Sequence, residues 1–172
     1  LRMLKENKDE AFDLLRSALT APRFDSTDVE RIRNQVLSSL RRESTNPTSL
    51  AGRKFLEVAY GDHPYGRSAN GTLESVPAIT VADLRDYVAR VIARDTLRIA
   101  VVGDVDPDTL GKLLDKTFGG LQAKSKLAPV ADITAAKPPQ RAFVPLDVPQ
   151  TVIIFGGPGI MRHDPDFMAA YV

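Results

Sequence analysis

Successive stretches of the chain carry apolar residues at helical spacing, and each is bounded by proline, by glycine or by a residue type that caps helices. The first stretch stops before Pro22, the second ends at Asn46-Pro47, and a later one starts at Thr80 with Asp83 in the capping-box position. Helices are predicted over residues 4–19, 28–43, 47–60, 80–92 and 106–118. Most of the chain before residue 119 is therefore expected to be helical.

The remaining regular structure is predicted from short runs of β-branched and aromatic residues. Residues 97–102 are expected to form a largely buried strand, and residues 142–144 and 151–155 two more, separated by prolines. Consecutive helices followed by isolated strands favour the α+β class over a regular alternation of strands and helices.

Composition and charge exclude several classes of protein. The 172 residues are 43% apolar and 26% charged, as in an ordinary globular protein with room for a core. The net charge of +1 gives no electrostatic reason to expect nucleic acid or an anionic membrane surface as a partner. The absence of cysteine excludes disulfides, cysteine zinc sites and thiol nucleophiles. No apolar run approaches the roughly 18 residues of a membrane span.

The residues contain no complete motif for catalysis. His63 and His163 are the only histidines, they form no His-x-x-x-His pair, and no G-x-S-x-G turn is present. The glycine-rich residues 156–159 include Pro158, which removes a backbone donor, so they indicate a sharp bend and not a phosphate cradle. We therefore predict no catalytic residue, no cofactor-binding residue and no complete metal site within this sequence.

Several short motifs nevertheless occur in one characteristic order. They are Pro22-Arg23-Phe24-Asp25, His63-Pro64-Tyr65-Gly66-Arg67, Gly71-Thr72-Leu73-Glu74-Ser75-Val76, Ile99-Ala100-Val101-Val102-Gly103-Asp104, Gly156-Gly157-Pro158-Gly159 and Asp164-Pro165-Asp166-Phe167. The series resembles the pitrilysin and mitochondrial-processing-peptidase (M16) family of metallopeptidases, in particular its bacterial members.

The resemblance implies a partial M16-type α/β roll, with helices packed on a mostly antiparallel sheet. It implies that residues 1–125 are the later part of one domain, 126–140 a Lys- and Pro-containing linker, and 141–172 the beginning of a second, homologous domain. The chain is accordingly expected to be a piece of a longer protein.

Active members of the family bind zinc through an inverted H-x-x-E-H helix and a glutamate on a later helix, and the resemblance allows the second element to be tested. The H-x-x-E-H motif is not among these residues and would lie upstream of Leu1. The expected position of the third ligand falls on Ser39, whose hydroxyl is a poor zinc ligand. A register shift of four residues would place Glu43 on the same helical face, as an alternative third ligand.

These observations favour a non-catalytic M16 subunit that walls a chamber, holds unfolded peptide and pairs, as a homo- or heterodimer, with another M16 subunit. Zinc is then expected in the catalytic subunits of the family and no cofactor in this piece. One alternative is a catalytic zinc endopeptidase whose H-x-x-E-H segment lies outside the sequence; another is a binding or scaffold module without a peptidase role.

The candidates for contact with a partner or peptide are His63, Tyr65 and Arg67. The alternative is that Pro64 and Gly66 simply shape a turn at this place. Resemblance to bacterial members also implies a periplasmic or extracytoplasmic location.

Overall fold

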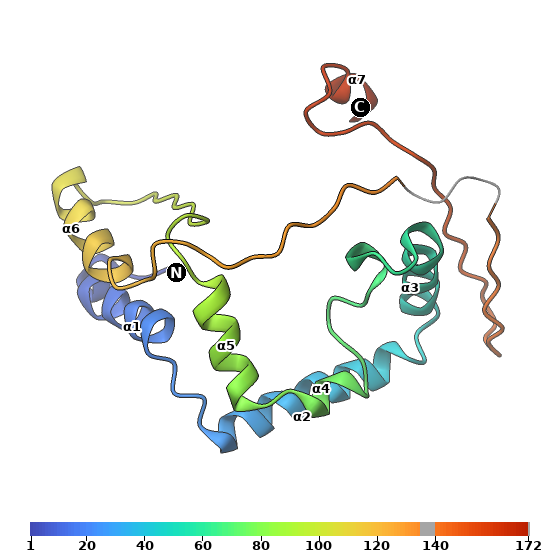
Figure 1. Ribbon diagram of the computed structural model, residues 1–172, viewed down its shortest axis with the longest axis horizontal. Coiled ribbons are helices and arrows are strands. Elements are labelled where there is room, and N and C mark those ends of the chain that lie inside the picture. The colour runs from blue at the N-terminus through green and yellow to red at the C-terminus, as the bar shows by residue number, and fades with distance from the viewer. Residues whose placement is uncertain (135–139, 172) are drawn as a thin grey trace. The chain divides into compact units, whose positions relative to one another are not determined.

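The computed structural model describes residues 1–134 and 140–171, whose regular structure is helical (Figure 1). The α-helices are α1 (Lys8–Thr20), α2 (Ser26–Glu43), α3 (Pro47–Tyr60), α4 (Ser75–Ala78), α5 (Val81–Val91), α6 (Pro107–Phe118) and α7 (Phe167–Tyr171). Two 3₁₀ turns, η1 (Lys5–Asn7) and η2 (Pro64–Gly66), complete the set. The predicted helices are thus confirmed to within a few residues, whereas α4 and η2 fall where the sequence predicted a loop or no element.

Side-chain caps explain where three of these helices begin. Asn46 Oδ1 accepts a hydrogen bond from the Ser49 backbone N–H at 2.9 Å, and Pro47 occupies the first turn of α3. Thr80 and Asp83 form the predicted capping box of α5. Asp106 accepts from the Thr109 backbone N–H at 2.9 Å at the start of α6.

The same hydrogen bonds stabilise the charged form of two capping carboxylates. The Thr80 hydroxyl and backbone N–H both donate to Asp83 and hold its pKa below the ordinary value. The Thr109 backbone N–H lowers the pKa of Asp106 in the same way. Both carboxylates therefore favour the folded state only while they are ionised.

The chain forms two compact units, each built from two segments of the sequence. The first comprises Leu1–Ile32 and Ala78–Pro129, and the second Arg33–Pro77 and Val130–Val172.

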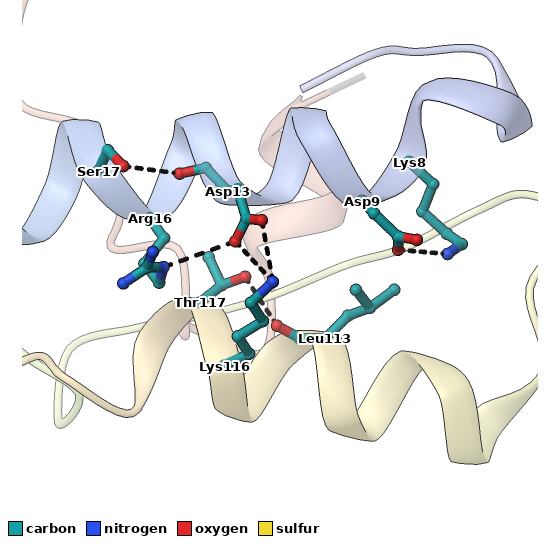
Figure 2. Close-up of polar contacts among 8 residues, drawn as sticks. All are labelled: Lys8, Asp9, Asp13, Arg16, Ser17, Leu113, Lys116 and Thr117. Carbon is teal, nitrogen blue, oxygen red and sulfur yellow. Dashed lines mark hydrogen bonds and ion pairs between the residues drawn. The ribbon is translucent and has the colours of Figure 1, made fainter.

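In the first unit α1 lies against α6, and Figure 2 shows polar contacts within each helix together with the Lys116–Asp13 contact that joins them. Lys116 Nζ donates to Asp13 Oδ2 at 2.9 Å and lies 2.7 Å from Oδ1, and this partner lowers the pKa of Asp13. Thr117 is only 1% exposed, and its hydroxyl is satisfied by the Leu113 carbonyl oxygen at 2.7 Å. The Lys116–Asp13 ion pair therefore links the two helices, while the buried Thr117 hydroxyl is satisfied within α6.

In the second unit a small apolar cluster joins α2 to α4. Leu37, Leu40 and Val76 are buried, with Val36 packed against them. The Arg33 guanidinium donates to the carbonyl oxygens of Val76 and Pro77, at the end of α4. This cluster is the buried apolar core of the unit among the described residues.

The predicted α+β roll, with helices packed on a mostly antiparallel sheet, is wrong for the residues that the structure describes. Residues 97–102, 142–144 and 151–155 form no strand, and the only bridge among the described residues joins Ala93 to Gln122. The expected burial of residues 97–102 is wrong as well, since Val102 is fully exposed. β-Branched composition favours an extended backbone but cannot supply the partner strand that a sheet requires.

The proposed domain boundaries, 1–125, 126–140 and 141–172, stay predictions. The linker falls in part on residues 135–139, outside the described residues.

Candidate functional site

A surface pocket of about 700 Å³ lies between α3 and the loop that follows it, in the second unit. Glu43, at the end of α2, and Arg53, on α3, line it together with loop residues Tyr65, Arg67 and Asn70. All of these residues come from one continuous stretch of 28 positions, 43–70, and therefore belong to one compact unit.

The loop owes its path to backbone geometry and to a histidine cap. Gly61 ends α3 with a positive φ of 55°, a conformation that glycine adopts without strain. His63 Nδ1 accepts a hydrogen bond from the Tyr65 backbone N–H at 3.2 Å, and its Nε2 lies 3.0 Å from the Ala131 carbonyl oxygen. His63 therefore ties the turn to a later segment of the same unit.

Aromatic rings form one wall of the pocket. The Tyr65 ring makes edge-to-face contacts with Tyr60, at 5.7 Å between ring centroids, and with His63, at 4.7 Å. Tyr65 nevertheless remains 59% exposed. The two neighbouring rings therefore orient the Tyr65 ring and leave more than half of its surface accessible to a ligand.

Ser39 and Glu43 line a second pocket, of about 950 Å³, together with other residues of α2 and Asn70. The two residues lie four positions apart within α2, so the helix places them on one face. Ser39 Oγ accepts a hydrogen bond from Arg42 Nη2 at 2.9 Å, and Glu43 Oε1 accepts one from Asn70 Nδ2 at 3.4 Å.

The donor set around Ser39 does not fit a zinc site. A serine hydroxyl is a weak ligand, and a guanidinium at hydrogen-bond distance would repel a divalent cation. Among residues 1–134 and 140–171, no group of three His, Cys, Asp or Glu side chains could hold a metal ion. Whether Ser39 or Glu43 stands at the family's ligand position stays a prediction.

The structure brings together most of the predicted contact residues and adds others. Tyr65 and Arg67 line the first pocket, while His63 supports it from outside the lining. Sequence reasoning missed Arg53, Tyr60 and Asn70. The signal for Arg53 was its spacing: it lies three and seven residues before Leu56 and Tyr60, on one face of α3.

Comparison with known proteins identifies the family. The profile described as the peptidase M16 inactive domain matches residues 78–172, more than half of the chain. The chain belongs to the peptidase M16 family. Its M16 resemblance is thus confirmed, and the family-level association with zinc is supported by relatives that carry the name zinc protease.

Some relatives of this M16 chain are named as proteases and another is named as a non-peptidase homolog. An uncharacterized zinc protease of Mycobacterium leprae is 33% identical over 68% of this chain and 26% of its own length. The non-peptidase homolog YmxG of Helicobacter pylori is 28% identical over 92% of this chain and 36% of its own length. The beta subunit of the mitochondrial-processing peptidase of Saccharomyces cerevisiae is 25% identical over 98% of this chain and 37% of its own length.

A solved structure agrees with this assignment. The crystal structure of a peptidase M16 inactive domain from Pseudomonas fluorescens matches 78% of this chain and 32% of that chain, at a TM-score of 0.70 and 28% identity. The M16 chain described here thus spans well under half of the length of its relatives. None of its described helices is long and apolar enough to cross a membrane.

Proposed function

We propose that this chain comes from a non-catalytic M16 subunit, which walls a peptide chamber and holds unfolded peptide for a zinc-bearing partner subunit. The observation that carries the proposal is the Ser39–Arg42 hydrogen bond. Ser39 is the residue at which the family resemblance leads us to expect a carboxylate ligand, and its hydroxyl is bonded to a guanidinium.

The environment of Glu43 supports the same proposal. Its carboxylate accepts a hydrogen bond from the Asn70 amide and lines a pocket together with Arg53 and Arg67. The carboxylate can therefore interact with an amide and with cationic side chains, without a metal ion. The similarity to a protein named non-peptidase homolog and to a subunit of a processing peptidase is consistent with a role in a heteromer.

The test uses the full-length protein, purified alone and together with any M16 protein encoded beside it. We expect the protein alone to bind unfolded peptide, to carry no stoichiometric zinc after dialysis, and to cleave no peptide. The mixture is expected to cleave the peptide, and a chelator to stop that cleavage.

Two substitutions sharpen the experiment. Ser39→Ala removes the only side-chain oxygen at the expected ligand position, so it should leave cleavage by the mixture unchanged. Glu43→Gln removes the alternative ligand and should leave the zinc content of the mixture unchanged. Stoichiometric zinc and cleavage by the protein alone, both lost in Glu43→Gln, would instead establish the catalytic alternative. Absence of peptide binding and of cleavage in every combination would favour the scaffold alternative.

A further inference from the structure

The first pocket contains more positive than negative charge, and its positive groups are incompletely used. Arg53 and Arg67 contribute two guanidinium groups and Glu43 one carboxylate. Arg67 donates one hydrogen bond, to the Asp62 carbonyl oxygen at 3.1 Å. Within the described ranges 1–134 and 140–171, no hydrogen bond or ion pair engages Arg53. A guanidinium has five N–H donors in a planar fork, so both residues keep donors available for an anion.

The rest of the lining limits what kind of anion fits. Tyr60 and Tyr65 present aromatic surface, and Leu56 is 41% exposed beside them. A volume of about 700 Å³ lies in the range of pockets that hold organic ligands and is far larger than one inorganic anion requires. The combination of arginine donors and an apolar wall suits a carboxylate that is carried on a chain with apolar groups.

We infer that this pocket binds a carboxylate of an unfolded peptide, with Arg53 and Arg67 as the donors and Tyr65 as the surface for the neighbouring side chain. The inference rests on the proposed function only in that the ligand is a peptide. The carboxylate can belong to the C-terminus or to an Asp or Glu side chain, and both present the same pair of oxygens to an arginine.

The negative charge of Glu43 weakens the binding of an anion in this pocket. Its carboxylate lies on the same lining and repels an incoming anion, although the Asn70 amide offsets part of its charge. Removal of this charge should therefore strengthen binding of the peptide. Misfolding would not strengthen binding of the carboxylate peptide alone, so Glu43 provides a test that does not depend on loss of function.

The experiment measures binding of unfolded peptides, labelled with an uncharged dye of the BODIPY class that has no carboxylate, to the full-length protein, with its partner where the two are isolated together, by fluorescence anisotropy at low salt. One peptide has a free C-terminus and one glutamate; the others have an amidated C-terminus, a glutamine in place of the glutamate, or both changes. We expect the doubly neutral peptide to bind about tenfold more weakly, and the two singly changed peptides to show which carboxylate is used.

Variants then assign the effect to the pocket. Arg53→Gln should remove most of the tenfold preference, and Arg53→Lys should keep part of it because the charge remains without the fork. Arg41→Gln, on α2 outside the pocket lining, is the matched control and should retain the full preference. Glu43→Gln should tighten binding of the carboxylate peptide about two- to fivefold and leave binding of the neutral peptide unchanged.

The possible outcomes separate this inference from the proposed function. Equal binding of all four peptides overturns the carboxylate site while the peptide-holding role stands. An equal effect of Arg53→Gln and Arg41→Gln, or unchanged binding in Glu43→Gln, assigns the preference to general surface charge and also overturns the site. If no peptide binds at all, both the inference and the proposed function fail.

Discussion

Gly66 lies so close to the end of α3 that only a hydrogen atom fits at its Cβ position. A methyl group there would come within 2.3 Å of the Gly61 carbonyl oxygen, a backbone atom that can move only if the helix end moves. We therefore expect Gly66→Ala to lower the free energy of unfolding by about 1–3 kcal/mol, the usual cost of a steric overlap. Urea denaturation followed by circular dichroism measures this loss.

Gly111 is the matched control for that substitution. It lies inside α6, and a Cβ atom built on it meets nothing within 4 Å. Gly111→Ala should raise the free energy of unfolding by about 0.5–1 kcal/mol, because alanine loses less backbone entropy in a helix. If Gly66→Ala and Gly111→Ala both lowered the free energy of unfolding, the explanation by steric overlap at Gly66 would be contradicted.

Individual residues of the site were only partly predictable from the sequence. The His63–Arg67 motif pointed to Tyr65 and Arg67, and helical spacing placed Ser39 and Glu43 on one face; all four line pockets. Arg53 shares a helical face with Leu56 and Tyr60, but that spacing alone does not single it out, because an arginine on a helix is normally a solvated surface residue. Its importance depends on the turn at Gly61, which brings the loop back over α3.

At the scale of the elements, the start of α5 depends on a reciprocal pair of hydrogen bonds. The Asp83 backbone N–H donates to Thr80 Oγ1 at 3.2 Å, while the Thr80 backbone N–H donates to Asp83 Oδ2 at 2.7 Å. Thr80→Ala removes the cap and should lower the free energy of unfolding by about 1 kcal/mol. Thr80→Ser, which keeps a hydroxyl, should cost clearly less, and equal losses in the two variants would argue against the cap.

The capping box also predicts how stability depends on pH. The pKa of Asp83 lies below its ordinary value of 3.8 because the Thr80 hydroxyl and backbone N–H favour the carboxylate. Its contribution is therefore complete above the unfolded-state pKa and is lost as the pH falls through the folded-state pKa. Unfolding measured from pH 5 downward should show a shallower acid slope in Asp83→Asn than in the parent protein, and a parallel slope would contradict this assignment.

Helices were easier to predict than strands for a physical reason. A helix satisfies its backbone hydrogen bonds locally, so caps and apolar spacing identify α3, α5 and α6 from sequence alone. A strand pairs with residues far away in the sequence or outside it. The β-branched runs at 97–102 and 151–155 therefore predicted strands wrongly, because no partner strand pairs with them among the described residues.

At the scale of the whole molecule, the exposed apolar residues of the C-terminal segment are expected to promote association. Ile153 is 77% and Phe155 91% exposed. Apolar side chains presented in this way promote association between molecules. We expect a variant that carries both Ile153→Ser and Phe155→Ser to associate less at high concentration, as measured by sedimentation velocity, with an unchanged melting temperature.

Ile154 provides the control in the same segment. Its Cδ1 atom lies beside Gly52 of α3, and Ile154 is only 39% exposed. Ile154→Ser should therefore lower the melting temperature. Unchanged association of the double variant would show that these exposed side chains are not what brings molecules together.

Some predictions at this scale depend on parts of the protein beyond these residues. The domain boundaries, the extracytoplasmic location and the pairing with a second M16 subunit all concern the longer relatives, of which this chain spans about a quarter to two fifths. Fractionation of cells that produce the full-length protein would test the location directly.

The aromatic wall of the first pocket also makes it an optical reporter. The chain has four tyrosines and no tryptophan, and two of those tyrosines, Tyr60 and Tyr65, lie 5.7 Å apart at this one site. Half of the tyrosines therefore lie in the lining of this one pocket. A quencher, or a ligand that covers Tyr65, would alter the ultraviolet emission of this segment without any attached dye.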